Sequence, residues 1–478
     1  MHKLLASVLL GFSCILAPAA EAPVLLGSAE IPALMQLTEN LGKLADKFSP
    51  GSSVKLVLGV TAISFSPQFI DFDTAAPIRA FLYGRNGTGG KPLLEWCLVL
   101  KKKKEQAPPL VVMSDNMEMH VKDSGPYAIL SSSKTLLASI KELPTPSEPS
   151  ADIVLSIRPE ACLPFCKDEL GAARSFLTEA FMRSENPEDA NIPAAKALQI
   201  KLSYAEKILP QISRLDTEIF FQDQDVKIRM KFDPAKNSEL GKFIIAQAGL
   251  KPASLSLCGG KLSSGFLNLS LSPVVKESLS TMVRELMLEL SEDEKDLRAT
   301  NLLAGLCKDF DGRASYFSDL RNDLPVTVFS IDMPRELADK FTKQLGPASG
   351  ESGLCLISSN SGPRGKKLKL FCKSIPSGLV LLYGALEAEE AAKLLSTAPV
   401  PVELPKDVSP SSNIVGIFSI PPKKGKDAAS AEPGGFFAAH CKDGSAIFDF
   451  NFKIDALKEA VPASASEPSN HKKKSRLK

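Results

Sequence analysis

Residues Val226–Asp233 read VKIRMKFD, and residues Phe448–Asp455 read FDFNFKID. Both stretches alternate apolar side chains with polar or charged ones. Successive side chains of a β-strand point to opposite faces of its sheet, so this period of two predicts a strand with one face on a hydrophobic core. Each stretch ends at an Asp, a good N-cap, and we expect helices to start at Pro234 and Ala456. The two stretches begin 222 residues apart (448 − 226) and predict one strand in two copies.

Other segments repeat in the same order. The repeated pairs are Asp71–Asp73 with Asp309–Asp311, Met117–Lys122 with Leu368–Lys373, Tyr127–Leu130 with Leu379–Leu382, and Asp152–Pro159 with Asn413–Pro421. A helical segment follows the third pair in each copy, over residues 134–143 and 386–395. We interpret the order as an internal duplication; the alternative is generic β-rich patterning. The predicted fold class is α+β, with two related halves, each a mainly antiparallel sheet packed against amphipathic helices.

These repeats divide the chain into regions. Residues 20–250 form the first α+β repeat, with a helical insert at about 164–215, and residues 251–460 form the second. Apolar side chains at steps of three and four predict amphipathic helices near residues 34–48 and 274–289. Residues 461–478 form a polar, basic tail, for which we expect disorder.

The first 19 residues have the features of a secretory signal peptide. A short basic start precedes an apolar run from Leu4 to Leu16 and a small-residue site around Ala19. The alternative is a buried N-terminal helix. No later segment has about 18 uninterrupted apolar residues, so we expect no transmembrane segment in the mature chain. The sequence thus predicts an extracytoplasmic protein, either periplasmic or secreted.

Charge is unevenly distributed along the chain. The 57 Lys and Arg residues nearly balance the 55 Asp and Glu residues, and the segment His471–Lys478 is strongly basic. The body is then mildly acidic, which argues against specific nucleic-acid binding. The tail can contact an anionic surface or polymer through charge alone; the alternative is a solvated tail.

Export leaves eight cysteines, an even number that permits disulfides in an oxidising compartment. They are Cys97, Cys162, Cys166, Cys258, Cys307, Cys355, Cys372 and Cys441. Several lie at apolar strand positions, where a free Cys also packs well. The sequence leaves their pairing open.

Two motifs resemble catalytic signatures. Ser131–Lys134 fits S-x-x-K and Ser114–Asn116 fits S-D-N, as in penicillin-binding proteins and serine β-lactamases. Here their order is reversed and no K-T-G follows, so we interpret Ser131 as a helix cap. Gly84–Lys91 looks like a phosphate-binding loop. However, five residues separate its first Gly from its Gly-Lys pair, whereas a P-loop has four there. An Asn-Gly pair within it favours a hairpin turn.

Metal and histidine sites are sparse. The mature chain has only His120, His440 and His471, so we expect no histidine-rich zinc site. A Ser-His-Asp triad through His120 or His440 stays open, although no G-x-S-x-G motif supports one. The candidates for a cation site are the paired carboxylates, which alternation places on one side with Phe inward: Asp71, Asp73, Asp309 and Asp311. The alternative is a charged, solvated strand edge.

No pattern identifies a catalytic residue or a cofactor. The sequence therefore favours a non-catalytic binding or structural module of the cell envelope or extracellular space, and leaves enzyme activity open. One alternative is an envelope hydrolase with an unrecognised Ser or Asp site. Another is an apolar-ligand (lipid) carrier, in which Phe-rich strands would line a cavity.

Overall fold

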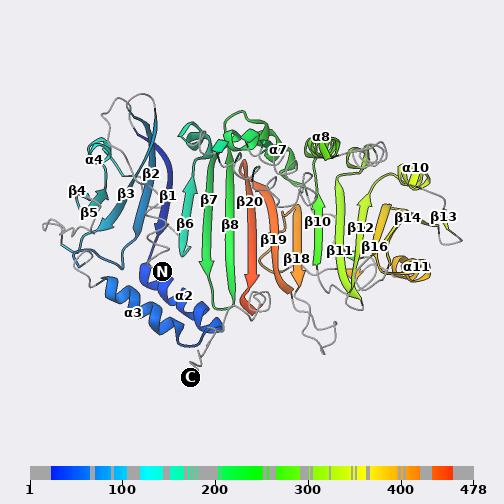
Figure 1. Ribbon diagram of the computed structural model, residues 1–478, viewed down its shortest axis with the longest axis horizontal. Coiled ribbons are helices and arrows are strands. Elements are labelled where there is room, and N and C mark those ends of the chain that lie inside the picture. The colour runs from blue at the N-terminus through cyan, green and yellow to red at the C-terminus, as the bar shows by residue number, and fades with distance from the viewer. Residues whose placement is uncertain are drawn as a thin grey trace, which may run out of the picture.

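The computed structural model describes the chain between residues 23 and 455 (Figure 1). The gaps in this range are residues 65–69, 88–90, 105–118, 144–150, most of 166–205, 251–255, 258–264, 291–300, 302–304, 322–323, 346–347, 350–352, 362–366, 397–399, 402–404 and 420–432. The predicted signal peptide, the basic tail, the S-D-N motif and most of the predicted helical insert lie outside the described residues.

The described elements are mixed helices and strands. The first-half strands are β1 (Val24–Ile31), β2 (Ile78–Asn86), β3 (Pro92–Lys101), β4 (His120–Ser124), β5 (Tyr127–Ser131), β6 (Ile153–Ile157), β7 (Ile212–Phe221) and β8 (Asp225–Pro234). The second-half strands of the main sheet are β10 (Gly265–Ser270), β11 (Arg313–Arg321), β12 (Leu324–Asp332), β13 (Ala348–Ser349), β14 (Leu354–Ser361), β15 (Lys367–Ile375), β16 (Gly378–Gly384), β18 (Ile414–Ser419), β19 (Pro433–Lys442) and β20 (Ser445–Lys453). The short strands β9 (Ser256–Leu257) and β17 (Val400–Pro401) pair in a separate two-stranded sheet. The main helices are α2 (Leu34–Phe48), α3 (Ser52–Ser64), α4 (Lys134–Ser139), α7 (Glu239–Gln247), α8 (Pro273–Leu290), α10 (Arg335–Leu345) and α11 (Ala388–Ser396).

One antiparallel sheet of 18 strands runs through the described residues. Its paired neighbours give the order β4-β5-β3-β2-β1-β6-β7-β8-β20-β19-β18-β10-β11-β12-β16-β15-β14-β13. The two strands with the alternating sequences, β8 and β20, are neighbours in the middle of this sheet (Figure 1). The two halves of the chain therefore share one sheet.

The order of neighbours repeats on either side of this central pair. Outward from β8 come β7, β6, β1, β2, β3, β5 and β4, and outward from β20 come β19, β18, β10, β11, β12, β16 and β15. Loop contacts repeat as well. The N–H of Asp73 donates to the C=O of Lys101 at 2.8 Å, and that of Asp311 donates to the C=O of Asp332 at 2.7 Å. The repetition of strand order thus extends to the Asp-Phe-Asp segments.

The pairing register places the alternating residues of the central strands on shared faces. Ile219 pairs with Ile228 in the first half, and Ala439 pairs with Phe448 in the second. Across the junction of the two halves, Ile228 pairs with Phe450 and Arg229 pairs with Asp449. Directly opposed residues share a face, so the apolar side chains of β8 and β20 lie together on one face of the sheet. The alignment of the two stretches as copies of one strand stays a prediction.

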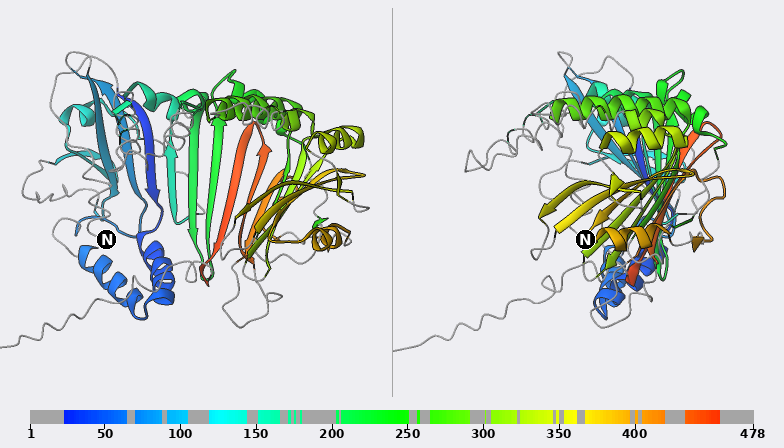
Figure 2. Two further views of the ribbon diagram at one scale, coloured as in Figure 1. Left: turned by 45° about the vertical axis from the view of Figure 1, so that its right-hand side comes forward. Right: turned by 90° about the vertical axis from the view of Figure 1, so that its right-hand side faces the viewer.

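The hydrophobic cores lie toward the two ends of the sheet. In the first half, α4 buries Leu136 and Leu137 against strand residues that include Phe81 and Val99. In the second half, α11 packs onto a core of β12, β15, β16, β18 and β19. Figure 2 shows α7 and α8 along one end of the strands and α2 and α3 at the opposite end. The middle of the sheet is left between two packed lobes.

Helix α7 begins later than the sequence predicted. The expected start at Pro234 is wrong, because β8 continues through Pro234 and the helix begins at Glu239. Ser238 is the N-cap, since its Oγ accepts the N–H of Gly241 at 3.0 Å. The Asp233 carboxylate instead accepts a hydrogen bond from the Ser445 hydroxyl at 2.6 Å. Asp233 thus joins β8 to the β19–β20 turn rather than capping a helix.

Two predicted helices match the structure closely, because their apolar stripes are long. These are α2, expected near 34–48, and α8, expected near 274–289. Within the described part of the chain, no helix is both long enough and apolar enough to cross a membrane.

Candidate functional site

The six central strands, β6, β7, β8, β20, β19 and β18, have two chemically different faces. Antiparallel pairing places directly opposed residues on the same face, so the register defines each set. We call one set the aromatic face; it comprises Ile153, Leu155, Ile157, Leu215, Thr217, Ile219, Phe221, Val226, Ile228, Met230, Phe232, Ala446, Phe448, Phe450, Phe452, Gly435, Phe437, Ala439, Cys441, Ile414, Gly416 and Phe418. The other set, the charged face, includes Asp216, Glu218, Lys227, Arg229, Lys231, Asp449 and His440.

Phenylalanine rings form a connected group on the aromatic face. Phe450 stacks with Phe452 at 6.4 Å between ring centroids and with Phe437 at 6.3 Å. Phe452 also contacts Phe418 at 5.7 Å, while Phe448 meets Phe232 edge-on at 5.2 Å. Centroid separations of this size are typical of aromatic pairs that attract each other. The rings come from both halves of the chain.

The aromatic face is not a buried core. The alternation predicted that this side packs on a core, but all its described residues in β6, β7, β8 and β20 are half-buried or exposed. Leu155 is 36% exposed and Ile157 is 46% exposed. None of these residues belongs to a core cluster of the described chain, because the helices near these strands lie at the strand ends (Figure 1).

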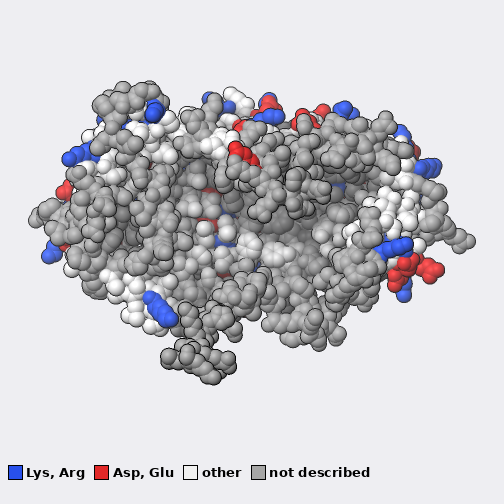
Figure 3. All heavy atoms as spheres, viewed as in Figure 1, with Lys and Arg blue, Asp and Glu red and all other residues white. Residues whose placement is uncertain are grey.

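The molecule is also hollowed over the central strands. In the view of Figure 3, atoms of Lys, Arg, Asp and Glu are visible on the floor of the hollow as well as at its rim. The apolar patch that the register defines on the aromatic face is of a kind that commonly marks a ligand or partner site.

The charged face carries matched charges. Arg229 Nε lies 2.7 Å from Asp449 Oδ1, and Lys227 Nζ lies 2.8 Å from Asp407 Oδ2. These groups line a shallow hollow of ≈ 260 Å³, and a second hollow of ≈ 170 Å³ lies beside Arg79. Neighbouring opposite charges cancel much of each other's field, and half-exposed pairs stabilise a fold little. Toward β18 and β19 the same face is covered by the core under α11, where Val415, Ile417, Phe436 and Ala438 are buried. We interpret its charged part, on β7, β8 and β20, as a solvated surface.

His440 does not form a catalytic triad with its nearest carboxylate. Its Nδ1 is 4.0 Å from Asp449 Oδ2, too far for a hydrogen bond, and makes none with the described residues. Burial lowers the pKa of His440 below its ordinary 6.5, an effect larger than the opposing pull of Asp449. The imidazole is therefore neutral at pH 7.

This lowered pKa predicts acid destabilisation. Below about pH 6.5 the unfolded chain binds a proton at His440 that the folded chain resists, so the free energy of unfolding falls as the pH decreases. We expect His440→Gln to remove this part of the loss between about pH 6.5 and 5. Urea unfolding of both proteins at several pH values measures it. Equal losses in the variant and the natural protein would contradict the assignment.

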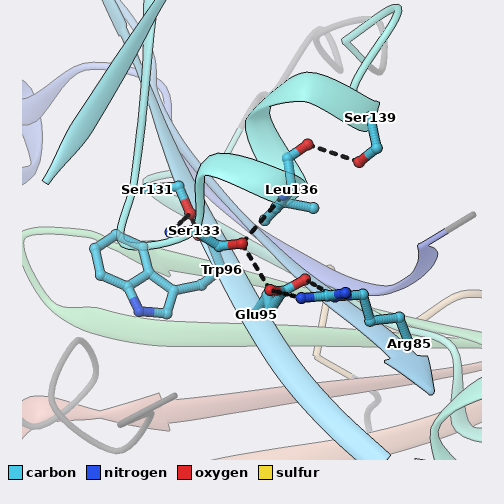
Figure 4. A network of polar contacts seen from close by, with 7 residues as sticks. All are labelled: Arg85, Glu95, Trp96, Ser131, Ser133, Leu136 and Ser139. Atoms are coloured by element: carbon cyan, nitrogen blue, oxygen red, sulfur yellow. Dashed lines mark hydrogen bonds and ion pairs between the residues drawn. The ribbon is translucent and has the colours of Figure 1, made fainter. Parts of the chain in front are cut away.

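The S-x-x-K serine has a structural role (Figure 4). Ser131 Oγ donates to the C=O of Trp96 at 2.6 Å and accepts the N–H of Ser133 at 3.1 Å. Ser131 is completely buried. The predicted helix cap is wrong by two residues, because Ser133 accepts the N–H of Leu136 and caps α4. Both hydroxyls thus serve the local fold.

The same region contains a buried ion pair (Figure 4). The Arg85 guanidinium binds both carboxylate oxygens of Glu95, at 2.7 and 2.9 Å, and both side chains are 4% exposed. Ser133 Oγ donates to the same carboxylate at 2.7 Å. The segment Gly84–Lys91, considered as a phosphate loop, joins β2 to β3, and Gly87 N–H donates to Lys91 C=O at 2.8 Å. The predicted hairpin is confirmed.

The paired carboxylates lie in the segments that precede β2 and β11. Phe72 and Phe310 between them are buried, as predicted. Asp73 Oδ1 accepts the N–H of Ala75 at 3.1 Å, and Asp73 Oδ2 lies 3.7 Å from Lys101 Nζ. Within the described chain, no group of three or more His, Cys, Asp or Glu is placed to hold a metal ion. A cation at Asp71, Asp73, Asp309 and Asp311 stays a prediction.

The joined aromatic face is what sequence reasoning missed. The two alternating stretches contain the signal for it, but each stretch alone predicts a strand over its own core. Compared with known protein families, curated proteins and solved structures, the chain matches none of them.

Proposed function

We propose that this protein is an exported, non-catalytic binding protein that holds an apolar, acyl-chain-like ligand against the aromatic face. The observation that carries the proposal is the half-exposed apolar surface of β6, β7, β8 and β20, continued by the half-buried rings of Phe437 and Phe418. Such a surface gains free energy when an apolar ligand removes it from water.

The size of the face suits a lipid chain. Six strands span about 24 Å at about 4.8 Å per spacing, and four residues on one face extend about 20 Å along a strand. Burial of about 200 Å² of apolar surface contributes roughly 5 kcal/mol before the costs of binding.

The chemistry of the face also favours hydrocarbon. Among the described residues of the aromatic face, the only ionisable group is the Cys441 thiol. The only hydroxyl group is that of Thr217. A folded protein partner usually meets a patch with a polar rim and arginine or tyrosine anchors. A hydrocarbon chain needs only apolar contact, which rings and branched side chains provide.

Duplication explains how so wide a face arose. We propose that an ancestral half was copied and that the two copies joined through the edges of β8 and β20. The repeated strand order and the direct pairing of β8 with β20 support this history. Joining two edges also covers the unpaired backbone groups that each half would otherwise expose.

Export and the basic tail fit the same proposal. A signal-peptide-like start favours export to the extracytoplasmic space, where lipids must cross water between surfaces. The C-terminal Lys and Arg residues can attract an anionic membrane surface. Both features are proposed from the sequence.

Mass spectrometry of the intact protein tests the binding proposal. We expect protein purified without detergent from its own compartment to carry apolar molecules that organic solvent extracts intact. A polarity-sensitive fluorescent fatty acid should then bind to the extracted protein and be displaced by unlabelled fatty acid. A lipid-free protein that also fails to bind the probe would refute the proposal, and release of cleaved lipid would favour the hydrolase alternative.

A further inference from the structure

Cys355 and Cys372 lie directly opposite each other on neighbouring strands. Cys355 is in β14 and Cys372 in β15, and the antiparallel register pairs them. Opposed residues share a face, with Cα atoms about 4.5–5.5 Å apart, and this range falls within that of disulfide-bonded cysteines. We infer that these two residues form a cross-strand disulfide when the chain folds under oxidising conditions.

The surroundings leave room for the bond to close. Disulfide Cβ atoms lie about 3.8 Å apart, slightly closer than opposed strand positions, so the strands must approach a little. β14 is next to the end of the sheet, where its outer neighbour is the two-residue β13. Its register with β15 shifts between Leu356 and Ser358, immediately beyond the pair. An outer, irregular strand adjusts more easily than one in the middle of a sheet.

The burial of both cysteines indicates at which stage of folding the disulfide forms. Both cysteines are fully buried in the core under α10, where Thr342 Oγ1 lies 3.8 Å from Cys372 Sγ. Burial raises the pKa of Cys372 to about 11, so the folded protein holds little of the reactive thiolate. Oxidation therefore precedes the closing of this core. The two thiols lose two protons and two electrons to an oxidant such as glutathione disulfide, which becomes two glutathione thiols.

Refolding the full chain in a glutathione redox buffer tests the inference. After quenching and blocking of free thiols, tryptic digestion without reductant should yield Gln344–Arg364 joined to Leu370–Lys373. Each peptide contains one of the two cysteines and no other. The linked product should disappear in Cys355→Ala and persist in Cys97→Ala, whose cysteine pairs with Phe81 across its strands. The oxidised protein should also melt roughly 5 °C higher than the reduced one.

The result is independent of the lipid-binding proposal. Recovery of both cysteines as blocked thiols from the oxidised, refolded natural protein would overturn the inference, as would a link from either one to a different cysteine. The decisive measurement is the peptide map of the natural protein, so it does not depend on whether a variant folds. Fatty-acid binding is measured on the same oxidised and reduced samples, and its loss or retention leaves the peptide result unchanged.

Discussion

Replacing Arg85 with Ala is expected to lower the free energy of unfolding by about 3–5 kcal/mol. The Glu95 carboxylate is buried and receives two hydrogen bonds from Arg85 and one from Ser133. Loss of the guanidinium leaves a buried negative charge with too little compensation. Urea or thermal unfolding of the two proteins at pH 7 measures the difference.

Two further proteins separate charge burial from general damage. Lys242→Ala removes an exposed pair with Glu239, in which both side chains are 63% exposed, and should change the free energy of unfolding by less than about 0.5 kcal/mol. The double variant Arg85→Met/Glu95→Met should recover much of the single variant's loss, because it buries no charge. If Arg85→Ala costs less than about 1 kcal/mol, water reaches this pair and the burial argument is wrong.

Replacing Phe450 with Glu is expected to weaken fatty-acid binding at least about tenfold, equivalent to about 1.4 kcal/mol. Phe450 stacks with Phe437 and Phe452 near the middle of the aromatic face. A carboxylate at this position would lose its hydration when an apolar chain covers it, which costs free energy. The substitution also removes the contacts of the Phe450 ring. Titration with the polarity-sensitive fluorescent fatty acid gives the dissociation constants.

Ile447→Glu is the matched control, because Ile447 lies three residues away in β20 on the opposite face. It pairs across the strands with Lys231, so a new carboxylate meets an opposite charge. We expect near-natural fatty-acid binding in this variant, with circular dichroism verifying that both variants fold. Equal weakening in both would show that the probe does not bind the aromatic face.

Local pattern predicted the elements well where it was long and regular. The stripe of Leu34, Leu37 and Leu41 gave the bounds of α2, because a helix is defined by its own periodicity. Helix starts were less predictable: Asp233 and Ser131 are both good caps, yet neighbouring strands use their side chains and Ser238 and Ser133 cap the helices instead. A capping preference of about 1 kcal/mol is readily overridden by such contacts.

By itself, the sequence determined the strands and which of their side chains share a face, since a period of two depends only on backbone geometry. The alternation in Val226–Asp233 and Phe448–Asp455 established this for β8 and β20. Only the tertiary structure decided that these strands pair with each other and that their apolar sides stay half-exposed. Pairing partners and coverage depend on residues distant in the chain, and a shift of two residues preserves the local pattern completely.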